Sequence, residues 1–181
     1  MQETETLYGL GMHTGVQLPF EQDGYIPTPE KRKKRHEENP EIFPNGRWYP
    51  GDNVNITVGQ GDVLVTPLQL ANAYATFANG GTNFAPNIVS SVFDRNGEVL
   101  KEFGKRVKEE IQIDPEFRNR VLRGLVGVTE DVEGTAYWAF NSLATDGAFF
   151  PLGNFPTAGK TGTAEVRGKA DSSLFAAITP A

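Results

Sequence analysis

The sequence predicts an α+β domain, in which helices pack on an antiparallel sheet. Apolar residues recur at helical spacing over residues 67–79 and 115–128, whereas short alternating runs separated by turn residues occupy 87–103 and 157–179. The 181 residues, of which 38% are hydrophobic, with 20 further glycines, match the composition of a globular domain. Disorder, collagen and coiled coil are therefore excluded for the chain as a whole.

The first third of the chain predicts turns and a polar surface segment. Residues 7–20 are rich in glycine, which predicts a tight turn followed by a short extended piece at 15–18. Residues 25–53 are polar and carry repeated prolines, so we expect a surface insertion there. Within it, the charged run 31–37 predicts a solvated helix or loop rather than a patch for nucleic acid or anionic lipid, because acidic residues follow at once. Gly59-Gln60-Gly61 predicts a tight backbone turn.

Residues 67–79 predict the clearest helix. Thr66 can cap it, Pro67 suits the first helical position, and Gly80-Gly81 ends it. Its expected apolar stripe comprises Leu68, Ala71, Tyr74, Ala75 and Ala78. An extended run then leads through Asn96-Gly97 into residues 98–103, which is typical of a β-hairpin.

The second half predicts further alternating elements. Residues 109–113 form a possible strand, and Asp114-Pro115 opens a second helix. The buried face expected for that helix comprises Phe117, Val121, Leu122, Leu125 and Val128. A short helix is expected over 136–143, and two strands over about 157–167 and 173–179, joined by a turn at 168–171.

Charge and composition exclude several classes of protein. The formal charge of −6 argues against general nucleic-acid binding. The absence of cysteine excludes disulfides, Cys nucleophiles and Cys–zinc sites. The longest apolar runs have five residues, far below the roughly 20 that a membrane-spanning helix requires. His13 and His36 lie too far apart in the sequence to form a metal pattern by themselves, and we expect the first to be structural or exposed and the second to be solvated.

Two other groups of side chains have an ordinary and a functional interpretation. The carboxylates Glu130, Asp131 and Glu133 predict a charged helix end rather than the carboxylate pair of a glycoside hydrolase. Core packing is the default for the aromatic residues Trp48, Tyr49, Trp138, Phe149 and Phe150. The pair Phe149-Phe150 is the better candidate for a cleft wall.

The sharpest chemical feature is Lys160-Thr161-Gly162-Thr163. A phosphate loop would need glycine where Asn154 stands, and the residues that follow indicate a strand rather than a helix, so we reject nucleotide binding. On a strand, Lys160 and Gly162 share one face, and Thr161 and Thr163 share the other. A cation with hydroxyl donors suits a carboxylate ligand, and a free strand edge could serve an oxyanion. A polar turn at a strand start remains the ordinary alternative.

Three stretches together resemble the transpeptidase domain of class B penicillin-binding proteins of the elongation type. They are residues 8–19 (YGLGMHTGVQLP), residues 49–75 from Tyr-Pro-Gly-Asp to Thr-Pro-Leu-Gln-Leu-Ala, and Gly134-Thr135-Ala136 followed by residues 158–165 (AGKTGTAE). The resemblance spans essentially the whole chain. It implies a serine β-lactamase-like fold and serine acyl transfer between peptidoglycan stem peptides, with β-lactams trapping the serine. No cofactor and no metal are implied.

The resemblance also implies roles for the residues of the Lys-Thr-Gly stretch. Lys160 would supply positive charge near the substrate carboxylate, and the hydroxyls of Thr161 and Thr163 would bind that carboxylate. The backbone N–H of Thr163 would form half of an oxyanion hole, with Gly162 allowing close approach.

The chain departs from the family in its serines. None of the five, Ser90, Ser91, Ser142, Ser172 and Ser173, begins the family's Ser-x-x-Lys or Ser-x-Asn motif. We therefore expect residues 1–181 to be a partial transpeptidase domain, on the C-terminal side, which supplies the substrate-binding strand but no catalytic residue. Its parent would be anchored by an upstream segment at the outer face of the bacterial cytoplasmic membrane. The expected partners are stem peptides, β-lactams and the cell-wall elongation machinery. The alternative is a noncatalytic domain of the same fold that binds cell-wall peptide or acts as a scaffold.

Overall fold

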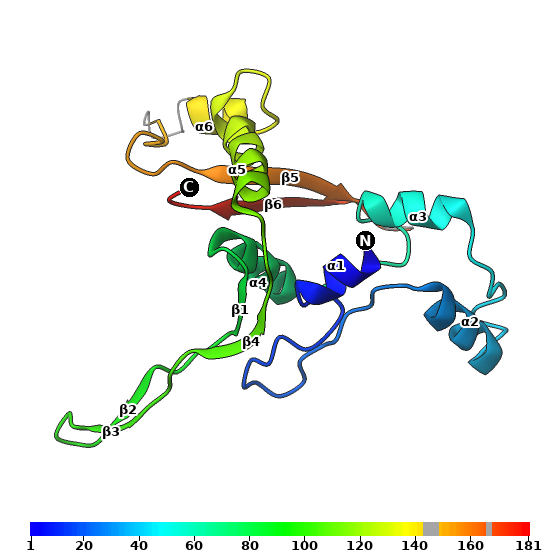
Figure 1. Cartoon of the computed structure of the whole chain (residues 1–181), viewed down its shortest axis with the longest axis horizontal. Helices are drawn as coiled ribbons and strands as arrows, with labels where there is room; N and C mark the ends of the chain where they lie inside the picture. The colour runs from blue at the N-terminus through cyan, green and yellow to red at the C-terminus, as the bar shows by residue number, and fades with distance from the viewer. Residues whose placement is uncertain (143–148, 166–167) are drawn as a thin grey trace. The chain divides into compact units, whose positions relative to one another are not determined.

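The computed structural model describes residues 1–142, 149–165 and 168–181. Two compact units make up the chain: Met1–Ala73 with Thr82–Glu110, and Tyr74–Gly81 with Ile111–Ala181. Helices and antiparallel strand pairs occur in both units (Figure 1). The α+β prediction is therefore confirmed, with the sheet present as three two-stranded antiparallel pairs within the described ranges.

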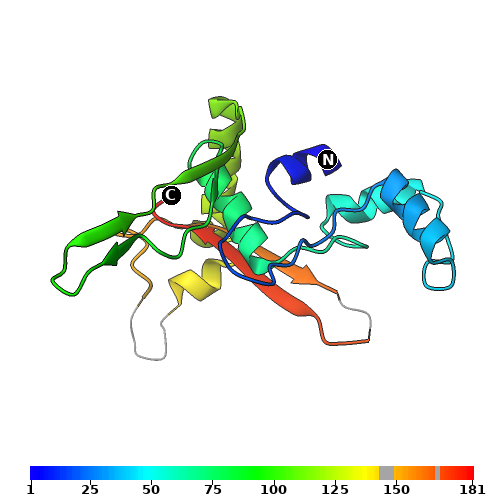
Figure 2. The ribbon, with the colours of Figure 1, turned by 90° about the horizontal axis from the view of Figure 1, so that it is seen from below.

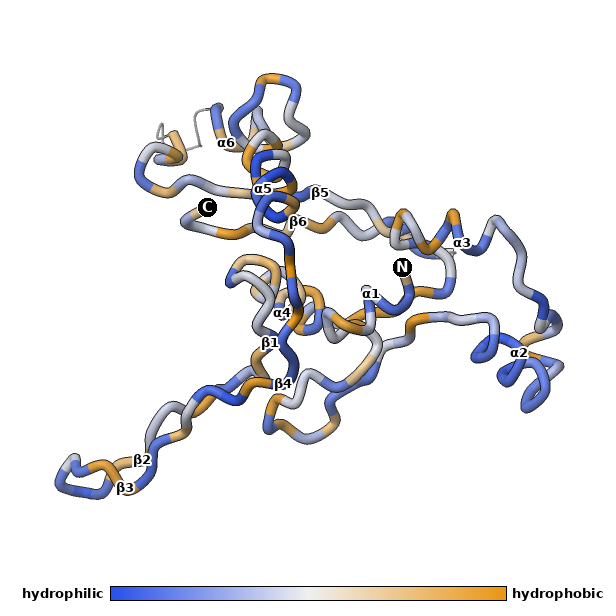
Figure 3. The backbone as a smooth tube through the Cα atoms, viewed as in Figure 1, coloured by the Kyte–Doolittle hydropathy of each residue, from blue (hydrophilic) through white to orange (hydrophobic). Residues whose placement is uncertain are grey.

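Sequence reasoning missed two helices of the first unit, α1 (Gln2–Leu7) and α3 (Pro50–Thr57). The first of these is short and polar. The charged run forms α2 (Pro29–Glu38), which begins with Pro29 and is capped by Thr28, whose hydroxyl accepts from the Lys31 amide at 3.2 Å. The hydrophilic colouring of α2 in Figure 3 agrees with its lack of buried residues. Proline also opens α3 (Pro50–Thr57), and the expected turn follows it, with Gly59 and Gly61 at positive φ.

The helix predicted at 67–79 is α4 (Pro67–Ala78). The Thr66 hydroxyl accepts from the Gln69 amide at 3.1 Å, so the predicted cap is confirmed. The predicted apolar stripe is wrong, because Leu68, Ala71 and Ala75 are exposed. The buried positions are Gln69, Ala73 and Thr76, two of which are polar. The Gln69 side chain is buried because its amide donates to the Met12 carbonyl oxygen at 2.7 Å.

Two strand pairs complete the first unit. The Asn-Gly hairpin is confirmed as β2 (Ser91–Phe93) and β3 (Val99–Glu102), and it continues outward from a second pair, β1 (Thr82–Ala85) with β4 (Arg106–Glu110) (Figure 1). The strand expected at 109–113 is found a few residues earlier, as β4. The sequence did not predict its true bounds because β4 is exposed along its length and so has no alternation of buried and exposed residues. The extended piece expected at 15–18 forms no strand.

Within its described residues, the second unit contains the end of α4, two further helices and the final strand pair. The second predicted helix is α5 (Pro115–Glu130), and the Asp114 carboxylate accepts from the amides of Glu116 and Phe117. Its predicted buried face is only partly correct, because Phe117 and Val121 are 69% and 44% exposed. The next helix is α6 (Tyr137–Asn141), and residue 143 of the predicted helix lies outside the described residues.

The last two strands are β5 (Ala158–Ala164) and β6 (Ser172–Ile178), which run antiparallel side by side (Figures 1 and 2). Both were predicted, although residues 166–167 of the first lie outside the described part of the chain. Among the described residues, no helix has the length and apolar character needed to cross a bilayer.

Candidate functional site

The Lys160-Thr161-Gly162-Thr163 stretch lies in the middle and second half of β5. In the ladder with β6, Lys160 is opposite Ala176, Thr161 opposite Phe175, and Gly162 opposite Leu174. Directly opposed residues of an antiparallel pair project to the same face. One face of the hairpin therefore carries Lys160 with Leu174, and the other carries Thr161 with Phe175. The alternation predicted from the sequence is thus present in the structure.

Lys160 is exposed, and its ammonium group lies close to its own strand. The Nζ atom donates to the carbonyl oxygen of Thr161 at 2.5 Å. Since an ammonium group has three donor hydrogens, two remain for other acceptors. By the alternation along β5, the Lys160 side chain projects to the face opposite to the side chains of Thr161 and Thr163.

Thr161 is held by a residue from outside the strand. Its Oγ1 lies 2.8 Å from the Oγ1 of Thr135, which follows the end of α5. Thr135 was part of a family-like stretch in the sequence but carried no predicted role. A lone threonine in a loop gives no sequence signal for such a contact, and only the packing of the loop on β5 reveals it.

The two glycines of β5 differ in what surrounds them. A Cβ at Gly162 would meet the Leu174 Cβ at 3.9 Å, an ordinary van der Waals contact, so space is available at that position. A Cβ at Gly159 would come within 2.6 Å of Cζ and 2.8 Å of Cε2 of Phe175. Gly159 is therefore the glycine that packing requires, and sequence reasoning did not separate the two.

Hydrogen bonds from the end of α5 fix the start of β5. The buried Thr129 hydroxyl donates to the Thr157 carbonyl at 2.6 Å, directly before the strand. The Asn141 side chain of α6 donates to the Thr129 carbonyl at 2.8 Å. The two helices and the strand are thereby joined through one threonine, and this arrangement sets where the Lys-Thr-Gly stretch begins.

Aromatic side chains pack beside this strand pair. The Phe140 ring lies 4.9 Å from that of Phe150 and 5.7 Å from that of Phe175, centroid to centroid. Phe150 thus joins a cluster next to β6, while Phe149 is 60% exposed. Core packing was the default expectation for five aromatic residues, and it is wrong for four of them, Trp138, Tyr49, Phe149 and Phe150, which are 68%, 47%, 60% and 42% exposed. The fifth, Trp48, is half-buried.

Both histidines belong to the first unit, and one differs from expectation. His13 is exposed as predicted and pairs with Asp23 at 2.8 Å. His36 was expected to be solvated, but its Nδ1 lies 2.7 Å from the Phe43 carbonyl oxygen and its ring packs near Gly46. The correction follows from the fold-back of the chain after α2, which brings residues 43–46 against the helix. Within the described ranges, no three His, Cys, Asp or Glu side chains are placed to hold a metal ion.

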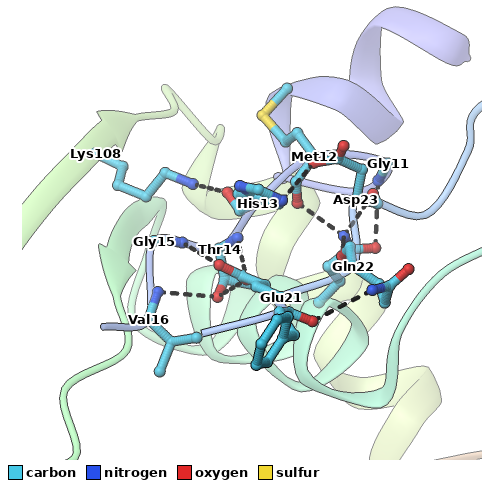
Figure 4. A network of polar contacts seen from close by, with 12 residues as sticks. Gly11, Met12, His13, Thr14, Gly15, Val16, Glu21, Gln22, Asp23 and Lys108 are labelled. Atoms are coloured by element: carbon cyan, nitrogen blue, oxygen red, sulfur yellow. Dashed lines mark hydrogen bonds and ion pairs between the residues drawn. The ribbon is translucent and has the colours of Figure 1, made fainter. Parts of the chain in front are cut away.

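A polar network organises the glycine-rich turn of the first unit (Figure 4). One Glu21 carboxylate oxygen accepts from the amide and hydroxyl of Thr14 at 2.6 and 2.5 Å, and the other accepts from the Gly15 amide at 3.3 Å. Burial alone would raise the pKa of Glu21, but the hydrogen bonds from Thr14 and Gly15 and the nearby His13 outweigh it and lower the pKa. The carboxylate therefore works as a charged acceptor that holds the turn.

A hollow of about 760 Å³ also lies in the first unit, lined among others by Thr6, Met12, Asn83 and Lys108. It brings together the turn, α1 and β4, and none of the residues predicted to bind substrate lines it. The Lys-Thr-Gly stretch lies elsewhere, on β5, where Lys160, Gly162 and Thr163 are exposed.

The chain is similar to known proteins in both sequence and structure. The family model for the penicillin-binding protein transpeptidase domain matches residues 1–181. The peptidoglycan D,D-transpeptidase MrdA of Haemophilus influenzae is 28% identical over 166 residues, which are 88% of this chain and 22% of that protein. The crystal structure of Pseudomonas aeruginosa PBP2 superposes with a TM-score of 0.71 at 24% identity, covering 99% of this chain and 35% of that one.

A second solved structure, the complex between PBP2 and MreC from Helicobacter pylori, gives a TM-score of 0.69 at 24% identity, covering 99% of this chain and 28% of that one. At this level of identity, the two structures establish the fold. The chain spans about a fifth of the length of the curated relatives that it matches over most of its own length.

Proposed function

Because the chain belongs to the family of penicillin-binding protein transpeptidase domains, we propose that the protein carrying it is a peptidoglycan D,D-transpeptidase. The relatives named MrdA and PBP2 agree with the elongation type. In this proposal a serine supplied from outside these 181 residues attacks the D-Ala-D-Ala peptide bond, and the terminal D-Ala leaves as the acyl-serine ester forms. An amine of a neighbouring strand then takes the acyl group and releases the serine. β-Lactams acylate the same serine. The protein works at the outer face of the cytoplasmic membrane.

The observation that carries the proposal is the placement of Lys160, Thr161 and Thr163 from the middle of β5 onward, where Lys160 and Thr163 are exposed and Thr161 is half-buried. The lysine projects to one face and the threonines to the other, and a strand at the rim of a cleft can offer all three groups to one carboxylate. The Lys160 ammonium and the threonine hydroxyls recognise the substrate carboxylate, and the Thr163 amide contributes to the oxyanion site. The partners are stem peptides, β-lactams and proteins of the elongation machinery. The last of these is supported by the H. pylori PBP2 structure, which was solved as a complex with MreC.

Labelling with a fluorescent penicillin tests the proposal. The 181-residue chain alone should remain unlabelled, since none of its five serines begins Ser-x-x-Lys, whereas a longer protein that includes the preceding coding sequence should be labelled covalently. Labelling of the isolated chain would contradict the assignment of the nucleophile. If the longer protein is also unlabelled, a noncatalytic peptide-binding domain becomes the better description.

The role of Lys160 has its own test in the longer protein. Lys160→Ala removes a charged hydrogen bond to the substrate carboxylate, which predicts a loss of roughly ten- to a hundredfold in the acylation rate. Lys169→Ala is the matched control, because Lys169 is an exposed lysine in the turn that leads to β6. Equal acylation rates for the two variants would show that Lys160 does not contribute to substrate binding.

A further inference from the structure

Thr135 contacts the predicted substrate-binding strand without belonging to it. Its hydroxyl lies 2.8 Å from that of Thr161, and the two residues are 26 positions apart in the chain. Thr135 is exposed and Thr161 is half-buried, so the pair lies at the solvent-facing rim of the strand. The contact therefore joins a loop hydroxyl directly to a residue that the proposed function assigns to carboxylate binding.

The backbone on both sides of Thr135 is firmly held. The Gly134 amide donates to the Asp131 carbonyl at 2.7 Å, and the amide of the buried Ala136 donates to the Val128 carbonyl at 3.0 Å. A Cβ at Gly134 would lie only 2.3 Å from the Gly127 carbonyl oxygen, so this loop packs directly against the end of α5. The hydroxyl of Thr135 is consequently presented from a fixed backbone.

The direction of the hydrogen bond between the Thr135 and Thr161 hydroxyls decides what Thr161 offers to a substrate. Each hydroxyl donates one hydrogen and accepts up to two. If Thr135 donates to Thr161, the Thr161 proton is free to point at a substrate carboxylate. If the direction is reversed, Thr161 presents a lone pair to that carboxylate, which repels it. A bound carboxylate thus favours the chain Thr135 to Thr161 to carboxylate.

We propose that Thr135 is a positioning residue for substrate recognition, which orients the Thr161 hydroxyl toward the substrate carboxylate. The inference rests on the proposed function, because it needs Thr161 to bind that carboxylate. A purely structural role would be different: the contact would only tie the loop to β5, and its loss would weaken folding without regard to the charge of the substrate.

The experiment measures acylation of the longer, catalytically complete protein by penicillin and by a penicillin ester that lacks the carboxylate. Thr135→Val keeps the shape of the side chain and removes the hydroxyl. It should slow acylation by penicillin roughly two- to tenfold, as expected for one neutral hydrogen bond, and leave acylation by the ester within about twofold. Thr135→Ser should restore the rate. Thr57→Val is the control, since it removes a hydroxyl that donates to the Asn53 carbonyl of its own helix.

A double-mutant cycle with Thr161→Val separates positioning from independent effects. The loss caused by Thr135→Val should disappear when the Thr161 hydroxyl is already absent. Equal losses with penicillin and with the ester, failure of Thr135→Ser to rescue, or an unchanged rate in Thr135→Val would each overturn the inference while the proposed function stands. A wild-type protein that penicillin does not acylate would overturn the proposed function and this inference with it.

Discussion

At the scale of single residues, Gln69 does what its apolar neighbours were expected to do. It is 1% exposed, and its Nε2 donates to the carbonyl oxygens of Met12 and Asp23, both at 2.7 Å. Its Oε1 accepts from the Thr66 amide at 3.2 Å. Separating the turn from α4 would leave the buried Gln69 amide without hydrogen-bond partners, which costs free energy. Gln69 therefore holds the glycine-rich turn against α4. Hydropathy ranks glutamine as a surface residue, so the sequence pattern pointed to the wrong face of the helix.

Glu21 gives a pH-dependent prediction in the same turn. Its folded pKa is lowered, so its contribution to stability is present above the ordinary glutamate pKa of about 4.3 and is lost as the pH falls through the folded value. Glu21→Gln should reduce the hydrogen-exchange protection of the Thr14 and Gly15 amides about tenfold at pH 7. Below about pH 4 the difference between variant and wild type should begin to shrink, because the carboxyl of the open form then takes up a proton, and it should vanish as the pH falls through the lowered folded pKa.

The comparison is made at each pH within the longer protein, with Glu41→Gln as the control, since Glu41 is exposed. A difference between wild type and Glu21→Gln that is constant from pH 7 to pH 3 would show that the charge of Glu21 does not hold the turn.

At the scale of elements, local chemistry predicted helices and turns better than it predicted faces and strand partners. Proline at the first position and a capping side chain marked the starts of α4 and α5, because such signals act within a few residues. Strand β1 was missed and β4 was displaced, since their pairing is formed between segments more than 20 residues apart. The buried faces of α4 and α5 depend on what packs against each helix, and periodicity alone does not contain that information.

The residues of the candidate site likewise fall into those that the sequence predicted and those that only the structure revealed. Lys160, Thr161, Gly162 and Thr163 were found as a motif on a strand, and the structure places all four on β5. Thr135 and Thr129 were assigned no role from sequence, because each acts through a contact with a segment more than 25 residues away. Their assignment required the loop and helix to be seen against the strand.

Packing within the strand pair gives a prediction for Gly159. In Gly159→Ala the new methyl group would overlap the Phe175 ring, so either the ring or the strand must shift. We expect a loss of about 1–3 kcal/mol in stability, typical of overpacking, seen as a lower melting temperature of the longer protein. Gly162→Ala should leave the melting temperature nearly unchanged, because its methyl group meets Leu174 at an ordinary distance.

A second substitution makes the cause specific. Phe175→Leu shortens the side chain that the Gly159 methyl group meets, so Gly159→Ala should cost less in that background. Additive losses in the double variant would instead place the strain of Gly159→Ala elsewhere, in the backbone or against Thr129.

At the scale of the whole molecule, apolar side chains remain exposed on several described elements. Phe117 is 69% exposed on α5, and Leu174 and Phe175 are 49% and 46% exposed on β6. Among the described residues, β5 and β6 pair only with each other, so each has one edge without a ladder partner. Exposed apolar groups and open strand edges favour self-association. The net charge of −6 opposes this association by repulsion.

The 181-residue chain expressed alone should therefore be marginally stable and prone to aggregate. Light scattering after size exclusion should show growing assemblies, and association should strengthen as salt screens the net negative charge. Leu174→Thr should slow it, because it removes apolar area from the exposed face of β6. A monomer that melts cooperatively and reversibly would contradict the prediction. Assemblies that dissolve at high salt would show that attraction between charges, rather than apolar contact, holds them together.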